Sequence, residues 1–211
     1  YQGTGANATV GHGLGSVPKM IFFKSLTNAI SWIVYSSELN ISSSNCLRLN
    51  GTNAAFTESA WNDTRPTTSL FSLGSHNEAN NNSGETIAYC FADVKGFSRM
   101  GSYTGNGNTN GSFVYTGFSP AWLMIKQVAA SNDWFIIDNK REPFNPNNVQ
   151  LVANTNGSAS TNKGDLNLLS NGFKPLSTNA AWNENNAVYV YMAFAQNPFV
   201  TGSSAIPTTA R

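Results

Sequence analysis

The sequence predicts an all-β protein, built from two tandem antiparallel β-sandwich or jelly-roll modules that arose by internal duplication. Short apolar runs alternate with turns rich in Gly, Asn and Ser, residues that tolerate left-handed backbone conformations and mark tight loops. No stretch sustains the i, i+3, i+4, i+7 apolar spacing of an amphipathic helix. The third observation is a set of residue matches between the two halves of the chain.

These matches occur without a gap at an offset of 102, the difference between the positions of Tyr103 and Tyr1. Gly and Pro have special backbone conformations and Trp is uncommon, so their agreement at one offset indicates a copied unit. A period of about 100 residues suits a whole small domain and is too long for a solenoid repeat. We expect a first module at 1–101, a second at 102–200 and a tail at 201–211. The matched pairs include Gly3/Gly105, Gly5/Gly107, Gly15/Gly117, Pro18/Pro120, Lys24/Lys126 and Trp32/Trp134.

Each module carries strand candidates in the same order. The segments Met20–Phe23 and Leu123–Ile125 are continuously apolar, so they should be central strands that are covered on both faces or buried at an interface. Two separate sandwiches are favoured over two halves of one larger jelly roll, because each copy has too few strands for a large jelly roll. The expected strands are Ala8–Gly13, Lys19–Leu26, Trp32–Ser36, Cys46–Leu49, Ser69–Leu73 and Thr86–Val94, then Ser112–Thr116, Trp122–Val128, Trp134–Asp138, Gln150–Ala153, Gly172–Ser177 and Ala187–Ala195.

Composition limits the partners of the protein. Charged residues make up 11% of the 211-residue chain, against about 25% in an average protein, and the net charge is +1. Lys and Arg are scattered, so we expect no nucleic-acid partner. No apolar run in the sequence is long enough to span a bilayer, so we expect no membrane insertion. The chain starts in a predicted strand without an initiating Met, and we expect it to be a fragment of a longer polypeptide.

Catalytic and metal-binding signatures are missing from the sequence. The acidic residues form no closely spaced pair of the kind that glycosidases of sandwich fold carry, and no zinc, calcium or nucleophile motif is present. We therefore expect a protein that is not an enzyme and that uses no cofactor and no metal. The cysteines, Cys46 and Cys90, have no counterparts between the copies; Cys90 suits a buried free thiol, with a disulfide between the two as the alternative.

The candidate binding residues are two tryptophans beside polar loops, neither of which has a match in the other copy. An indole next to amide, carboxylate and guanidinium groups supplies a ring face for a sugar and hydrogen bonds for its hydroxyls. The alternative is a Trp that closes a sandwich edge or makes an intersubunit contact. The two groups are Trp61, Asp63 and Arg65 in the first copy, and Trp182, Asn183 and Glu184 in the second.

The repeated residues are expected to form the scaffold, while function should lie where the copies differ. Trp32 and Trp134 open apolar strands and should pack in the core. Lys24 and Lys126 end apolar strands, so their stems should lie on the sandwich while the amines stay hydrated.

Several runs resemble tandem modules in tail-fibre and receptor-binding proteins of tailed bacteriophages, many of them marine. They include Tyr1-Gln-Gly-Thr-Gly5, Val10–Gly15, Trp32–Tyr35, Ile87–Ala92 and Gly96–Gly107, and the resemblance follows the two-copy layout over nearly the whole chain. It implies lectin-like, concanavalin-type β-sandwiches in a virion component that contacts the host surface as part of a homotrimer. It transfers no binding residue, because no ligand motif of the family can be matched to this sequence.

The expected function is therefore a non-catalytic tail-fibre or receptor-binding domain of an extracellular virion, which attaches to host cell-surface carbohydrate or another host receptor. Other virion chains are expected as partners. A purely structural head-fibre, decoration or collar protein is the alternative, and a polysaccharide depolymerase is the third reading.

Overall fold

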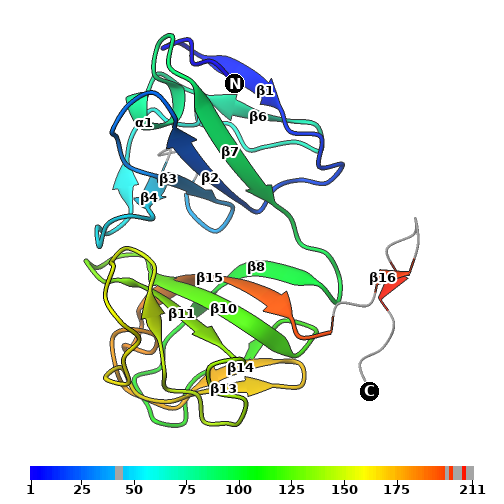
Figure 1. Ribbon diagram of the computed structural model, residues 1–211, viewed down its shortest axis with the longest axis vertical. Helices are drawn as coiled ribbons and strands as arrows, with labels where there is room; N and C mark the ends of the chain where they lie inside the picture. The colour runs from blue at the N-terminus through cyan, green and yellow to red at the C-terminus, as the bar shows by residue number, and fades with distance from the viewer. Residues whose placement is uncertain (41–44, 198–199, 202–205, 208–211) are drawn as a thin grey trace. The chain divides into compact units, whose positions relative to one another are not determined.

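The computed structural model describes residues 1–40, 45–197, 200–201 and 206–207, and in these ranges every regular element except one helical turn is a β-strand. The chain divides into two compact units, Tyr1–Ala92 and Asp93–Arg211. Figure 1 shows the strands of each unit in chain order by colour. The protein is all-β with several antiparallel sheets, as the sequence predicts.

The first unit contains a five-stranded antiparallel sheet and a separate strand pair. The sheet has the order β5-β4-β3-β2-β7, and β1 pairs with β6. The single helical turn, α1 (Asn77–Asn80), precedes β7. The strands are β1 (Ala8–Gly11), β2 (Met20–Ser25), β3 (Ile33–Ser36), β4 (Asn45–Arg48), β5 (Phe56–Thr57), β6 (Leu70–Leu73) and β7 (Thr86–Phe91).

The second unit contains a five-stranded antiparallel sheet of order β12-β11-β10-β15-β8 and a three-stranded sheet of order β13-β14-β9. A strand pair, β16 (Val200–Thr201) with β17 (Ile206–Pro207), lies in the expected tail, whose other residues fall outside the described ranges. The remaining strands are β8 (Ser98–Thr104), β9 (Val114–Tyr115), β10 (Pro120–Gln127), β11 (Trp134–Asp138), β12 (Leu151–Val152), β13 (Leu166–Leu169), β14 (Gly172–Pro175) and β15 (Val188–Ala195).

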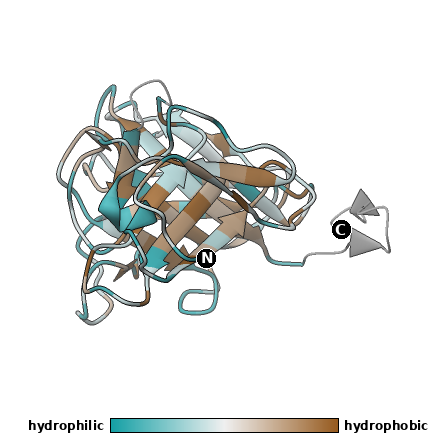
Figure 2. Cartoon of the chain, turned by 90° about the horizontal axis from the view of Figure 1, so that it is seen from above, coloured by the Kyte–Doolittle hydropathy of each residue, from teal (hydrophilic) through white to brown (hydrophobic). Residues whose placement is uncertain are grey.

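Each unit has its own hydrophobic core, to which both of its sheets contribute. In the first unit Ile21 and Phe23 of β2 pack with Phe71 and Leu73 of β6. In the second, Leu123 and Ile125 of β10 pack in one cluster with Phe173 of β14. Apolar residues gather on the strands and polar residues on the connecting loops, as Figure 2 shows. Burial of these apolar side chains is the main force that holds each pair of sheets together.

The continuously apolar runs of the central strands are buried, which confirms the expectation from their composition. In β2, Met20 to Phe23 are all buried, as are Leu123 to Ile125 in β10. The strand pairing is equivalent in the two units. Phe23 of β2 lies opposite Ala88 in β7, and Ile125, the residue of β10 that matches Phe23, lies opposite Tyr191 in β15.

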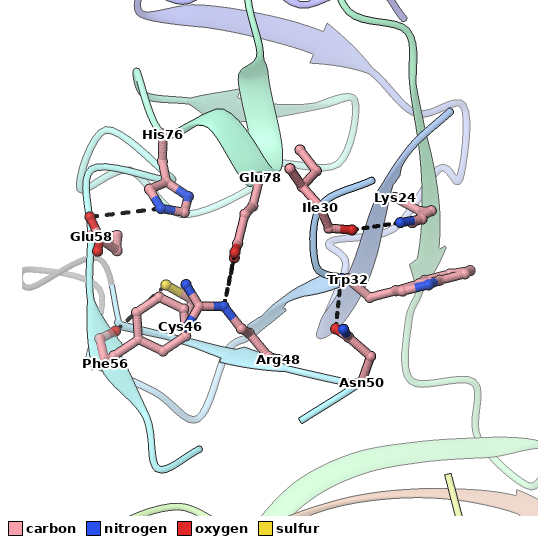
Figure 3. Close-up of polar contacts among 10 residues, drawn as sticks. All are labelled: Lys24, Ile30, Trp32, Cys46, Arg48, Asn50, Phe56, Glu58, His76 and Glu78. Carbon is pink, nitrogen blue, oxygen red and sulfur yellow. Dashed lines mark hydrogen bonds and ion pairs between the residues drawn. The ribbon is translucent and has the colours of Figure 1, made fainter. Parts of the chain in front are cut away.

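Each unit has an equivalent hydrogen bond of its own at the start of a strand, β3 or β11. The backbone N–H of Trp32 donates to Oδ1 of Asn50 at 2.9 Å, and the N–H of Trp134 donates to Oδ1 of Asn154 at 2.9 Å. Figure 3 shows the first of these bonds. Trp134 is buried, as expected, whereas Trp32 is half-buried and stacks on Tyr89 with 6.2 Å between the ring centroids.

The structure differs from the expectations at the junction of the two units. The units divide after Ala92, whereas the repeat suggested a first module that ends at residue 101. The segment Ser98–Thr104, which is absent from the expected strands, is the strand β8 and pairs with β15 over its whole length. Gly101 and the two serines of this segment give it weak intrinsic strand preference, so its conformation depends on the partner strand.

Candidate functional site

Trp61, the first predicted sugar contact, is a core residue. Its side chain is 2% exposed and packs between Phe23 and Tyr35, at ring-centroid distances of 5.1 and 5.7 Å. The indole Nε1 donates to the carbonyl oxygen of Asn45 at 3.2 Å. No ring face is left for a sugar, so the expectation of an exposed indole is wrong here. A large aromatic ring gains more by burial than the polar neighbours in its loop can offset.

Trp182 and Asn183 are also internal. Trp182 is 0% exposed and meets the ring of Phe135 edge-on at 5.7 Å. Its Nε1 is buried with no hydrogen-bond partner within the part of the chain that the structure describes. Asn183 is 0% exposed as well. These two residues belong to the scaffold of the second unit and are not available to a ligand.

Asn183 ties two loops together through its side-chain amide. Its Nδ2 donates to the carbonyl oxygens of Asn108 and Ser177 at 2.7 and 2.9 Å, and its Oδ1 accepts from the backbone N–H of Asn106 at 3.0 Å. A buried amide whose donors and acceptor are all engaged contributes to stability, while each unpaired group would cost free energy. The role of Asn183 is therefore structural.

The first unit contains the same arrangement at Asn80. Its Nδ2 donates to the carbonyl oxygens of Ala6 and Gly74 at 2.6 and 2.7 Å, and its Oδ1 accepts from the N–H of Thr4 at 2.7 Å. Sequence reasoning missed this residue, because in a chain so rich in Asn nothing marks one asparagine as buried.

An ion pair fixes the helical turn that carries Asn80. Nε of Arg48, on β4, lies 2.9 Å from both carboxylate oxygens of Glu78 in α1. The guanidinium also lies over the ring of Phe56, 4.1 Å from its centroid. Figure 3 shows Arg48 extended between Glu78 and Phe56, with His76 directed to Glu58 nearby. This cluster joins β4, β5 and α1 and has a structural role.

The other predicted residues are exposed but lie apart. Arg65 donates from Nη1 to the carbonyl oxygen of Ser37 at 2.8 Å, which holds its loop against the end of β3. Asp63 lies in the same loop in a left-handed conformation, with φ of 47°. In the second unit, the carboxylate of Glu184 accepts a hydrogen bond from Nε2 of Gln127. None of these three residues lies beside an exposed indole of its own group, since both indoles are buried.

Lys126 differs from the expectation of a hydrated amine. The residue is 0% exposed, and its Nζ donates to the carbonyl oxygens of Gln127 and Ala130 at 2.8 and 3.2 Å. Burial lowers the pKa of this amine from 10.5 to about 8, while the nearby carboxylate of Asp133 acts in the opposite direction. Lys24, its match in the first unit, donates from Nζ to the carbonyl oxygen of Ile30 at 2.6 Å and is half-buried. Both matched lysines therefore bind backbone carbonyls, and each reaches one carbonyl in a loop, that of Ala130 or Ile30.

Two of the exposed aromatic residues lie together on the outer face of the three-stranded sheet in the second unit, whereas Tyr89, Phe97 and Phe144 are exposed elsewhere. Phe113 and Tyr115 are 49% and 65% exposed, while Val114 between them points into the core. Tyr115 lies opposite Gly172, so no side chain from β14 covers its ring. We call Phe113 and Tyr115 the aromatic face.

Both rings of the aromatic face lie next to a glycine: Phe113 next to Gly172, and Tyr115 next to Gly117. A Cβ atom at Gly172 would come within 3.1 Å of the Phe113 ring and 2.1 Å of the Val114 carbonyl oxygen, so no side chain fits there. At Gly117, which has φ of 84°, a Cβ would lie 3.5 Å from the Tyr115 hydroxyl. The Phe113 ring thus lies close to the β14 backbone at Gly172.

Polar groups border the aromatic face. Lys174 is the next residue on β14 with an outward side chain, and its Nζ donates to Oδ1 of Asn110. Asn167 lies opposite Lys174 on β13. Flat aromatic rings beside amide and ammonium groups suit the apolar faces and hydroxyl groups of a sugar.

The first unit has no aromatic residue at the corresponding positions. Its β1 pairs with β6 as β9 pairs with β14, since Val10 faces Phe71 and Val114 faces Phe173. The outward neighbours of Val10 are Thr9 and Gly11. The aromatic face is therefore a feature of the second unit and lies where the two halves differ. The alternation Phe-Val-Tyr in a predicted strand was a signal that sequence reasoning could have used.

Neither a metal centre nor a membrane helix is found in the described residues. No group of three or more His, Cys, Asp or Glu side chains is placed to hold a metal ion in these ranges. In the same ranges, no helix has the length and apolar character needed to cross a membrane. Cys46 and Cys90 are free thiols, the first buried and the second half-buried, so the alternative of a disulfide is not realised.

Comparison with known proteins places the chain in a family. Residues 1–198 match a family described as "Domain of unknown function (DUF7483)". The chain belongs to the DUF7483 family. The matched residues contain both five-stranded sheets of this chain. No curated protein and no solved structure matches the chain.

Proposed function

We propose that this DUF7483 chain is a non-catalytic binding module of a tailed-phage virion that attaches to carbohydrate on the host cell surface. The observation that carries the proposal is the aromatic face of Phe113 and Tyr115, which is bordered by Lys174 and Asn167. Exposed aromatic rings on an otherwise polar surface mark binding sites. The resemblance to tail-fibre modules supports the location in an extracellular part of the virion.

We further propose that the two units are tandem copies of one β-sandwich module of lectin type. The residue matches at one offset support this duplication, and so do the common strand order and the equivalent amide contacts of Asn80 and Asn183. After a duplication, one copy is free to change its surface while both keep their cores. This accounts for an aromatic face in only one unit.

A trimeric assembly with other virion chains completes the proposal, as the resemblance implies. In such an assembly each binding surface is repeated, and repeated weak contacts raise the overall affinity. A sheet face with two rings and few charges is expected to bind a single sugar weakly, so multivalent display suits it.

The experiment compares adsorption of the labelled protein to a panel of bacterial cells, before and after removal of surface polysaccharide. We expect strain-specific adsorption that is lost on stripping. Phe113→Ala and Tyr115→Ala should each lower adsorption, and Tyr115→Ala should do so with little change in melting temperature, because Tyr115 is 65% exposed whereas Phe113 is 49% exposed.

Thr9→Ala is the matched control, since Thr9 lies on the corresponding outward face of the first unit. It should leave adsorption unchanged. Adsorption that survives both aromatic substitutions would remove the aromatic face as the binding surface. No adsorption by the correctly assembled protein would favour the purely structural virion role instead.

A further inference from the structure

An open groove of about 490 Å³ runs along the free edge of the five-stranded sheet in the first unit. Its walls are β7, which supplies Ala88 and Cys90, and the β1–β6 pair, which supplies Val10 and Phe71. Tyr1 lies at one end. β7 is the last strand of this sheet in the described ranges, so its outer edge carries backbone groups that can pair with another strand.

The corresponding edge of the second unit is covered. β15 occupies the place of β7, and β8 pairs with its outer side from Thr104 to Ser98. Gly101 of β8 lies opposite Tyr191, whose ring fills the space beneath it. In the first unit the residue at the position of Tyr191 is Ala88, because Ala88 faces Phe23 as Tyr191 faces Ile125. The groove therefore results from the small residue Ala88 together with the uncovered strand edge.

Tyr1 makes the contacts that Tyr103 makes at the end of β8. The Tyr1 hydroxyl donates to the carbonyl oxygen of Ala79, as that of Tyr103 donates to the carbonyl oxygen of Trp182. Their rings meet Phe71 and Phe173 edge-on, at 6.1 and 5.5 Å between centroids.

The backbone of Tyr1 is also paired as in a strand. Its amino group donates to the carbonyl oxygen of Thr86 at 2.9 Å, and the N–H of Thr86 donates to the carbonyl oxygen of Tyr1 at 2.8 Å. A polypeptide joined to this amino group would continue antiparallel to β7 and pass over Ala88 and Cys90.

We propose that the groove is the acceptor site for an additional antiparallel β-strand, formed by polypeptide joined to the amino end of Tyr1. This strand is the first-unit counterpart of Ser98–Ser102. Its backbone pairs with the N–H and C=O groups of Ala88 and Cys90, and its side chains close the groove. A residue placed two positions before Tyr1 would lie opposite Ala88, and a large apolar side chain there would occupy the volume that Tyr191 fills in the second unit.

A strand explains the groove better than a small ligand does. The groove follows the direction of β7, and its walls combine apolar side chains with polar groups along the outer edge of that strand. A main-chain partner satisfies the edge groups, and an apolar side chain satisfies the walls, in the manner of β-strand addition.

The test adds a second copy of residues 96–102 directly before Tyr1 and follows alkylation of Cys90 by a maleimide. Cys90 lines the groove and is half-buried, whereas Cys46 is buried in the core, so Cys90 is the accessible thiol. We expect the added strand to slow alkylation of Cys90 about tenfold, because reaction then requires local opening. Changing the added copy of Gly101 to Leu should slow it further and raise the melting temperature.

The control is the same extension with Arg99→Pro and Gly101→Pro in the added copy only. Proline lacks the N–H that would pair with β7, so this extension should leave Cys90 as reactive as in the original chain. Equal Cys90 reactivity in the three extended proteins and the original chain, each with an unchanged far-ultraviolet spectrum, would overturn the proposal.

Discussion

At the scale of single residues, two buried asparagines and one buried lysine show how the chain uses its polar side chains. Asn80 and Asn183 each connect a loop early in their unit to the loop before β7 or β15, chiefly through backbone groups. Lys126 directs its amine to loop carbonyls. These contacts hold irregular loops in place, where no sheet ladder is available to pair the backbone.

Asn183→Ala should lower the free energy of unfolding by about 2–3 kcal/mol, because it leaves buried backbone groups unpaired. Chemical denaturation measures the effect. Asn156→Ala is the control, since Asn156 is exposed, and it should change stability by less than about 0.5 kcal/mol. Equal stability of the two variants would contradict the structural role of Asn183.

Lys126→Met should alter the pH dependence of stability. The folded pKa of Lys126, about 8, lies below its ordinary value of 10.5. Between these values the unfolded chain binds more protons than the folded chain, so this group destabilises the fold fully below pH 8 and the destabilisation fades as the pH rises. Melting temperatures from pH 7 to 10 should therefore show a gain for Lys126→Met that is largest at pH 7. A gain that grows with pH would show that the sign is wrong.

At the scale of elements, the positions of the strands follow from the sequence more closely than their first and last residues do. The expected strands Trp134–Asp138 and Gly172–Ser177 appear as β11 and as β14, which ends at Pro175. β8 was missed, because a segment with Gly and Ser becomes a strand only through its partner β15. The candidate site was predicted less well. An indole beside polar residues gives the same sequence signal whether the ring points inward or outward, and only the packing of β2, β3 and β11 decides it.

Trp182→Ala should therefore lower the melting temperature sharply, with a cost of about 3–5 kcal/mol from lost packing and the cavity left behind. Differential scanning calorimetry measures it against Phe144→Ala, a control at a residue that is 83% exposed. Loss of cell adsorption with an unchanged melting temperature would instead support the original idea of a sugar contact at Trp182.

At the scale of the whole molecule, the chain consists of two units with separate cores, and the strands of their five-stranded sheets follow the same order. The partners of Asn80 all lie in the first unit and those of Asn183 in the second. The surfaces differ more than the cores do. The second unit carries the aromatic face, and the first carries the groove along β7. These differences are consistent with ligand binding by the second unit and strand addition at β7 of the first.

Local opening should therefore remain confined to the unit that is changed. Asn80→Ala should speed amide hydrogen exchange in residues 1–92, and Asn183→Ala should speed it in residues 93–197, since each amide joins loops of its own unit. Exchange followed by mass spectrometry tests this. Faster exchange of both units in either single variant would contradict the independence of the two cores.

The sequence by itself determined the all-β class, the order of the main strands and the match between the two halves. Strand period, turn residues and Gly, Pro and Trp positions are local properties that can be read along the chain. Only the tertiary structure decided that Trp61 and Trp182 are buried, that Ser98–Thr104 is a strand and that Phe113 and Tyr115 form an exposed face. Each of these depends on which distant strand lies alongside, because pairing and burial arise between segments that are far apart in the chain.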